Sequence, residues 1–220
     1  MREGLQPVSE HHTKKIGEAT AQYHKAVSHI SDQLAARGIT QDTAETFRLG
    51  YVNNPIPGHE KYAGWLTIPY MQPTLDGKTR VIDIRFRCAR KHDCKQRKHG
   101  KYQTLPGSLV KIFNLPVLAE NHPVMHICEG EFDAMILSQE GYPAIAVPGA
   151  QTWQPHWTRL LHGYNTVYVW SDPDQAGDDM ADMICDMLHS AIRVPLDVGD
   201  VTETFCAQGH AGLTGALNKC

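Results

Sequence analysis

Acidic residues follow three short apolar segments in the second half of this 220-residue chain. Glu129 follows VMHIC, Asp172 and Asp174 lie at the end of TVYVWS, and Asp200 comes shortly after AIRVP. The carboxyl ends of parallel strands form one ligand-binding edge of a sheet, so these acids are expected to converge there. Crowded carboxylates repel one another unless a cation neutralises them, and Mg²⁺ prefers oxygen ligands. The pattern therefore predicts metal-assisted phosphate chemistry.

Each of these acids also has a structural alternative, because an acid at the end of a strand commonly caps the next helix. Asp133 lies four residues after Glu129, on an expected helix EFDAMILSQEG. Gly130 and Gly177 remove side chains where a phosphate or a backbone must approach closely. Acidic features at three successive strand ends favour chemistry over capping alone. The other acids of the segment QAGDDMADMICDMLHS are expected to form a solvated helix face: Asp178, Asp179, Asp182 and Asp186.

The elements expected around these acids define an α/β protein. Short apolar strands alternate with helices from residue 122 onward, including a helix in TWQPHWTRLLHG, which predicts a mostly parallel sheet covered on both faces. Residues 10–36 and 41–48 are expected to be helical, and residues 49–118 to form strands and turns in an α+β subdomain. Asp76-Gly77 predicts a hairpin before TRVIDIRFR, a strand expected to turn a mostly charged face outward.

The formal net charge of −3 conceals a basic half and an acidic half. Residues 1–120 hold 18 basic and 11 acidic side chains, whereas residues 121–220 hold 3 and 13. Eleven of the basic residues lie between Lys78 and Lys111. Such density is typical either of a solvated loop or of a groove that follows a phosphodiester backbone, and the acidic metal site favours the groove.

Composition excludes several classes of protein. A hydrophobic content of 41% without any long apolar run argues against a membrane span, and MREGLQPVSEHHTKK lacks the apolar core of a signal peptide, so a cytoplasmic location is expected. The six cysteines are scattered, so free thiols are expected. Cys88 and Cys94, with His92 and His99 nearby, could form a small metal clip, but a basic loop is the favoured interpretation.

Several segments, in order, resemble a known family. EGEFDAMIL, WSDPDQAG and GDVTET resemble the TOPRIM domain, which has a Glu-Gly after its first strand and an Asp-x-Asp after its third. The preceding segments LAARGITQDTAETFRLGYV, GWLTIPYMQPTLDGKTRVIDIRFR, GKYQTLPG and KIFNLPVL resemble the catalytic core of primases of the bacterial DnaG and phage type. The resemblance covers residues from about 35 to about 207.

The resemblance implies a domain organisation and a set of site residues. It implies an N-terminal helical segment (1–38), a basic primase-like subdomain (39–120), a TOPRIM catalytic domain (121–207) and a C-terminal tail (208–220). The catalytic residues it implies are Glu129, Asp133, Asp172 and Asp174. The implied metal ligands are Glu129, Asp172, Asp174 and Asp200. The resemblance implies that Arg87 and Lys101 bind nucleic acid or nucleotides, and the basic stretch and the two glycines add Arg85, Lys98, Gly130 and Gly177 as candidates for the same role.

The implied activity is that of a nucleotidyltransferase, a DNA-directed RNA polymerase of the primase type. It would use one or two Mg²⁺ or Mn²⁺ ions, a single-stranded DNA template and ribonucleoside triphosphates. Without a CxxC pair no zinc ribbon is expected, so a replicative helicase or a separate zinc-ribbon protein is the expected partner. Thr202 stands where cellular primases have a second acid, as in some phage enzymes, which suggests a bacteriophage origin and the host cytoplasm. A TOPRIM nuclease and a non-catalytic nucleic-acid-binding replication factor remain alternatives.

Overall fold

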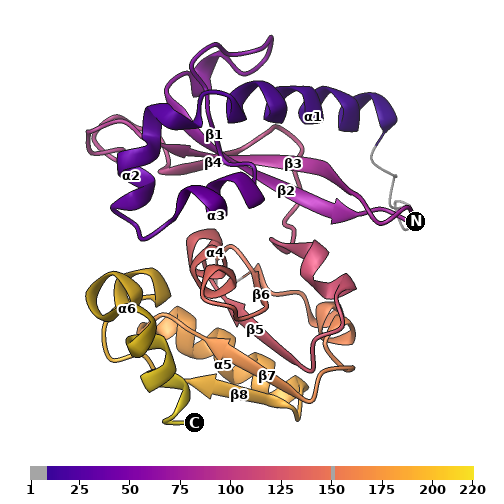
Figure 1. Ribbon diagram of the computed structural model, residues 1–220, viewed down its shortest axis with the longest axis vertical. Helices are drawn as coiled ribbons and strands as arrows, with labels where there is room; N and C mark the ends of the chain where they lie inside the picture. The colour runs from indigo at the N-terminus through magenta and orange to yellow at the C-terminus, as the bar shows by residue number, and fades with distance from the viewer. Residues whose placement is uncertain (1–8, 150–151) are drawn as a thin grey trace. The chain divides into compact units, whose positions relative to one another are not determined.

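The computed structural model describes residues 9–149 and 152–220, which divide into two compact units (Figure 1). The first unit comprises the described residues up to Ile30 together with Glu45–Ser108. The second comprises Ser31–Ala44 and Leu109–Cys220. Each unit has its own four-stranded sheet. Within the described ranges, no helix is both long and apolar enough to cross a bilayer.

The first unit is an antiparallel sheet with one long helix packed against it. Its strands, in the order β1-β2-β3-β4, are β1 (Gly50–Tyr51), β2 (Trp65–Pro73), β3 (Thr79–Cys88) and β4 (Tyr102–Thr104). Helix α1 (Glu10–His24) contacts β3, and two short 3₁₀ helices span Val27–Ile30 and Glu60–Tyr62. The apolar side chains that α1 contributes to this core are Ile16, Ala19 and Tyr23.

The helix predicted over residues 10–36 is wrong in its extent, because α1 ends at His24. Tyr23 and His24 are held by distant parts of the chain. The Tyr23 hydroxyl contacts His59 Nδ1 at 3.0 Å, and His24 Nδ1 donates to the carbonyl oxygen of Leu49 at 2.7 Å. These tertiary contacts fix the end of α1. The chain then continues as a 3₁₀ turn and the short helix α2 (Ser31–Ala35).

The predicted hairpin between β2 and β3 is confirmed. Gly77 has φ 75°, and the amide of Thr74 donates to the carbonyl oxygen of Lys78 at 2.8 Å. The predicted outward charged face of β3 is wrong, because Asp83 and Arg87 are 6% and 8% exposed. Strand β3 lies between β2 and β4 and contacts α1, and Asp83 also accepts a hydrogen bond from the Ser108 hydroxyl.

The second unit confirms the predicted parallel sheet. Its strands, in the order β6-β5-β7-β8, are β5 (Val124–Cys128), β6 (Ala144–Ala146), β7 (Thr166–Trp170) and β8 (Ala191–Val194). Its main helices are α4 (Glu131–Gln139), α5 (Gln175–Met187) and α6 (Val201–Leu217), beside the short 3₁₀ helix Leu115–Ala119. The helix expected over residues 41–48 is α3 (Gln41–Thr46). The segment TWQPHWTRLLHG, expected to be an α-helix, instead forms a 3₁₀ helix over Pro155–Leu160.

Helices cover both faces of this parallel sheet. Alternate side chains of β5 point to opposite faces, and Met125 and Ile127 pack with Met180 of α5 in one apolar cluster. On the other face, helix α4 contacts β5, β6 and α6. The hydroxyl groups of Tyr142, just after α4, and Thr214 of α6 lie 3.2 Å apart. The carboxyl ends of β5, β7 and β8 lead into the starts of α4, α5 and α6, respectively.

The side chain of Gln139, at the end of α4, forms hydrogen bonds with residues 38–43, which include the start of α3. Its Oε1 accepts from the Thr40 amide at 3.0 Å and from the Thr43 hydroxyl at 2.8 Å, and its Nε2 donates to the Gly38 carbonyl at 3.0 Å. The predicted tail 208–220 continues α6 as far as Leu217. The only break within that helix is a kink at Gly209, with φ 62°.

Candidate active site

Glu129 and Asp172 meet at the carboxyl edge of the parallel sheet. Glu129 comes directly after β5, and Asp172 follows the neighbouring strand β7. The Asp172 amide donates a hydrogen bond to Glu129 Oε1 at 3.0 Å. Two acids that lie far apart in the sequence are therefore in direct contact, as the strand-end pattern predicts.

Burial and nearby carboxylates raise the pKa values of both acids. Burial raises the pKa of Glu129 to about 7, and the charges of Asp172 and Asp174 act in the same direction. Burial also raises the pKa of Asp172 to about 6, with Asp200 and Asp174 adding repulsion. Crowded, partly desolvated carboxylates of this kind are a donor set that suits a hard divalent cation. The residues at this edge of the sheet therefore fit Mg²⁺ or Mn²⁺.

Gly177 allows this close approach. A Cβ at position 177 would lie 2.7 Å from Glu129 Oε1 and would also overlap the backbone of Asp172. The Gly177 amide itself donates to Asp174 Oδ1 at 2.9 Å. A side chain here would displace Glu129, so the glycine maintains the space beside the two acids.

Asp174 and Asp200 both act as helix caps. Asp174 Oδ1 caps α5 through Gly177, and Asp200 Oδ1 accepts from the Glu203 amide at 2.7 Å at the start of α6. The capping alternative is thus correct for both residues. Each cap uses one carboxylate oxygen, and a carboxylate has two that can accept. Capping is therefore compatible with a second role toward a cation.

Asp133 lies deeper, at 5% exposure, and connects α4 to α6. Its Oδ1 accepts from the Thr202 amide at 2.9 Å and from the Thr202 hydroxyl at 2.6 Å. Burial raises the pKa of Asp133 to about 7, Asp200 adds repulsion, and the two Thr202 hydrogen bonds oppose the rise. A Cβ on Gly130 would overlap the Asp133 carboxylate. Asp133 therefore links α4 to α6. Its partner Thr202 has no local sequence signal, because the two residues are 69 positions apart.

The four expected basic residues lie on β3 and the loop after it. The guanidinium carbons of Arg85 and Arg87 lie 4.5 and 5.4 Å from the centre of the Tyr102 ring, which is cation–π geometry. Strand pairing places Arg87 opposite Tyr102. Lys98 and Lys101 are exposed in the loop between β3 and β4. The structure thus gathers two arginines on one aromatic ring and leaves the two lysines in the adjoining loop.

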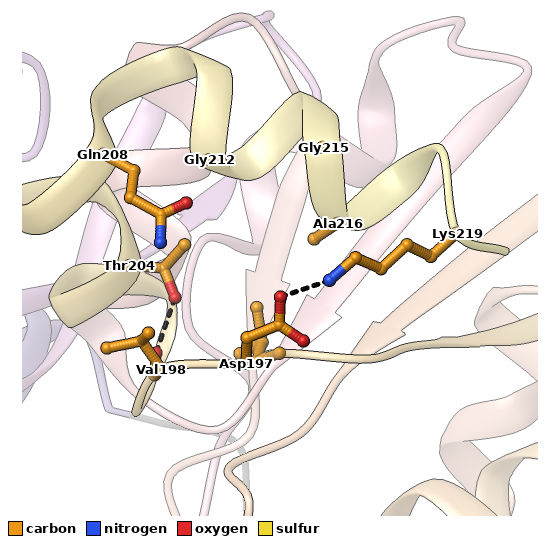
Figure 2. A pocket seen from close by; sticks show the side chains of 9 residues that line it. Asp197, Val198, Thr204, Gln208, Gly212, Gly215, Ala216 and Lys219 are labelled. Atoms are coloured by element: carbon orange, nitrogen blue, oxygen red, sulfur yellow. Dashed lines mark hydrogen bonds and ion pairs between the residues drawn. The ribbon is translucent and has the colours of Figure 1, made fainter.

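A cavity of about 170 Å³ lies beside α6, and Figure 2 shows its lining. An ion pair between Asp197 and Lys219 crosses it, and the Thr204 hydroxyl donates to the Val198 carbonyl at 2.7 Å. Asp197, Val198, Thr204 and Lys219 are thus paired within the lining. The cavity is lined by the loop after β8, by α6 and by Lys219, and the acids at the carboxyl edge of the sheet do not line it.

The parallel sheet with acids at its carboxyl edge defines a Toprim-like α/β protein, and residues 126–199 match the family described as Toprim-like. The Gene 57 protein of Mycobacterium phage D29 is 36% identical over 153 residues, which make up 69% of this chain and 97% of that protein. The chain therefore belongs to the family of the Mycobacterium phage D29 Gene 57 protein.

Solved primase structures share the fold. The RNA polymerase domain of Mycobacterium tuberculosis primase DnaG matches with a TM-score of 0.74 at 16% identity, over 96% of this chain and 84% of that one. The zinc-binding and RNA polymerase domains of Aquifex aeolicus primase match with a TM-score of 0.73 at 20% identity, over 99% of this chain. The chain spans 63% of that Aquifex protein. The resemblance to TOPRIM-domain primases is thus confirmed for the fold.

Proposed function

We propose that this chain is the catalytic core of a DNA primase, which synthesises short RNA primers on single-stranded DNA. The contact between Glu129 and Asp172 carries the proposal, because it gathers partly desolvated acids at the carboxyl edge of a Toprim-like sheet. The likeness to DnaG cores extends over nearly the whole chain and supports the choice among Toprim-like proteins.

The residues proposed to hold one or two Mg²⁺ or Mn²⁺ ions are Glu129, Asp172, Asp174 and Asp200. When bound, the ions would neutralise charge on the phosphates and lower the pKa of the attacking hydroxyl. Burial raises the pKa of Glu129 to about 7 in the metal-free protein, and Glu129 is the proposed proton acceptor. Gly177 keeps the space beside Glu129 open, and Gly130 does the same beside Asp133. Asp133 acts as a positioning residue through Thr202.

The proposed substrates are a single-stranded DNA template and ribonucleoside triphosphates. A DnaG catalytic domain of this fold is known bound to single-stranded DNA, and the similar T7 primase fragment comes from a primase–helicase protein. In this chain the proposed contacts to phosphates are Arg85, Lys98 and Lys101, and the Tyr102 ring would stack on a base. Arg87 is 8% exposed, so its proposed role is to position the Tyr102 ring rather than to contact a phosphate. A helicase or a separate zinc-ribbon protein is the proposed partner in the cytoplasm of a phage-infected cell.

Primer synthesis by the purified chain tests the proposal. The chain is incubated with single-stranded DNA, labelled ribonucleotides and Mg²⁺ or Mn²⁺, in parallel with Asp172→Asn and with Asp186→Asn, which makes the same charge change on an exposed position of α5. We expect oligoribonucleotides from the wild type and from Asp186→Asn, and none from Asp172→Asn.

Two other outcomes would replace the proposal. DNA shortened without synthesis, and only when Asp172 is intact, would indicate a Toprim nuclease. DNA binding without any reaction, unchanged in Asp172→Asn, would indicate a non-catalytic replication factor. A helicase or zinc-ribbon protein from the same genome is added in a second series, so that a requirement for a partner is measured directly.

A further inference from the structure

Four potential metal ligands come together at the end of β3. The ligand atoms of Cys88, His92, Cys94 and His99 all lie within 4.8 Å of one another. Cys88 is the last residue of β3, and the other three lie in the loop that leads to β4. Two thiols and two imidazoles are a ligand set typical of structural zinc.

The distances match a tetrahedral ion. Cys88 Sγ lies 3.5 Å from His92 Nε2, and His92 Nε2 lies 2.9 Å from His99 Nε2. Zinc bonds of about 2.3 Å to sulfur and about 2.0 Å to nitrogen place such atoms about 3.5 Å and about 3.3 Å apart. A shift of a few tenths of an ångström in the two imidazoles would therefore admit the ion.

A hydrogen bond to the backbone orients the imidazole ring of His99 as a metal ligand requires. His99 Nδ1 donates to the carbonyl oxygen of Gly100 at 3.0 Å. A neutral imidazole that donates through Nδ1 presents a lone pair at Nε2, and Nε2 is the atom turned toward His92 and the thiols. A backbone carbonyl bonded to the second ring nitrogen is the usual way in which proteins orient a ligating histidine.

The loop itself favours a cross-link. Between Cys88 and Tyr102 it has neither helix nor strand, and it carries six basic side chains against one acid: Arg90, Lys91, Lys95, Arg97, Lys98 and Lys101 against Asp93. The like charges favour extension, yet His99 donates its amide to the Cys94 carbonyl at 3.1 Å. Cys88 and Cys94 are free thiols, so no disulfide closes the loop.

We propose that Cys88, His92, Cys94 and His99 bind one zinc ion that fastens the basic loop to the end of β3. With four protein ligands the site is closed, so its role is structural. It goes beyond the proposed primase function and does not depend on it. The Cys88 amide donates to the Lys101 carbonyl at 2.9 Å. An ion held by Cys88 therefore also fixes the position of Lys101, the residue before β4.

Metal content tests the site directly. Untagged protein, purified in reducing buffer, is analysed for zinc and then reconstituted with Co²⁺. We expect one zinc per chain and the visible spectrum of tetrahedral Co²⁺ with thiolate ligands. Cys94→Ser and His99→Ala should lose both signals, whereas the controls Cys206→Ser and His162→Ala, at exposed positions outside the loop, should retain them.

A second measurement covers variants that fail to fold. Chelation of the wild type should make trypsin cleavage within residues 89–101 roughly tenfold faster, because proteolysis follows the population of the open loop. Added zinc should restore resistance. The proposal is overturned by reduced wild type that binds neither zinc nor Co²⁺ stoichiometrically, by zinc binding that survives both ligand substitutions, or by cleavage that chelation does not change.

Discussion

The Asp172 amide donates to Glu129 Oε1 at 3.0 Å, across 43 positions of sequence, and joins the ends of β5 and β7. The bond holds the Glu129 side chain over the same edge from which the Asp172 carboxylate projects, so the two negative charges repel each other. Burial and neighbouring carboxylates raise the pKa of Glu129 to about 7 and that of Asp172 to about 6, and the charges that act on Asp172 are those of Asp200, Asp174 and Glu203. In the metal-free protein, the negative charges of these acids therefore lower the free energy of unfolding.

Asp172→Asn should stabilise the metal-free protein at alkaline pH. The raised pKa means that the folded state binds the proton more tightly than the unfolded chain, so stability is fully present below the unfolded pKa and is lost as pH rises through about 6. After discounting for solvent screening, we expect the variant to gain about 1 kcal/mol at pH 8 and almost nothing at pH 4. Chemical denaturation in chelator at both pH values measures this.

With Mg²⁺ bound, the wild type should instead be more stable than Asp172→Asn. The ion should raise the melting temperature of the wild type and of the control Asp186→Asn, but much less that of Asp172→Asn, since a ligand stabilises only the state that binds it. Equal stabilisation of all three proteins by Mg²⁺ would show that Asp172 is not a ligand.

Gly177→Ala should abolish activity although alanine favours helices. The added Cβ would overlap the Asp172 carbonyl oxygen and would lie 2.7 Å from Glu129 Oε1, so both the Asp172 backbone and the acid must move. Gly17→Ala, in α1, is the matched control, since a Cβ there meets no atom within 4 Å. We expect the control to be active and about 1 kcal/mol more stable, from helix propensity alone. Primer synthesis and thermal melts compare the two, and full activity of Gly177→Ala would contradict the proposed role of this space.

The features that could be predicted from the sequence have local causes. Asp76-Gly77 specifies the hairpin through the positive φ of Gly77, and the alternation of apolar strands with helices specifies the parallel sheet. The convergence of Glu129 and Asp172 follows from the same alternation, because neighbouring parallel strands end at one edge.

The features that could not be predicted depend on distant partners. Helix α1 ends at His24, where Leu49 accepts a hydrogen bond, and Asp83 is buried where Ser108 reaches it. Nothing in either local sequence indicates those contacts. The four potential ligands at the end of β3 are close in sequence, but only the folded loop shows that their atoms converge.

Thr202→Val should weaken the link between α4 and α6. The substitution keeps the shape of the side chain but removes the hydroxyl that donates to Asp133 Oδ1 at 2.6 Å. A hydrogen bond to a buried acid contributes about 1–2 kcal/mol, so the free energy of unfolding should fall by about that amount. Thr202→Ser retains the hydroxyl and should lose less. Urea denaturation compares the three proteins, and a Thr202→Ser variant that is less stable than Thr202→Val would mean that the methyl group, not the hydrogen bond, stabilises the site.

His126 on β5 should make stability depend on pH in the acidic range. Its ring is 2% exposed, and burial lowers its pKa to about 4. The unfolded chain takes up a proton below about 6.5 whereas the folded state resists it, so His126 removes stability as pH falls from about 6.5 to about 4. The shift corresponds to about 3 kcal/mol. His126→Gln is expected to be less stable than the wild type at pH 7, and this difference should shrink by about that amount at pH 4.

The control for this prediction is Trp170→Phe. Trp170 Nε1 donates to His126 Nδ1 at 2.9 Å, so the substitution removes the hydrogen bond while the histidine stays buried. Because burial is the cause of the lowered pKa, this variant should lose stability at both pH values and keep the wild-type pH dependence. If Trp170→Phe instead flattens the pH dependence as His126→Gln does, the hydrogen bond rather than burial keeps the imidazole neutral.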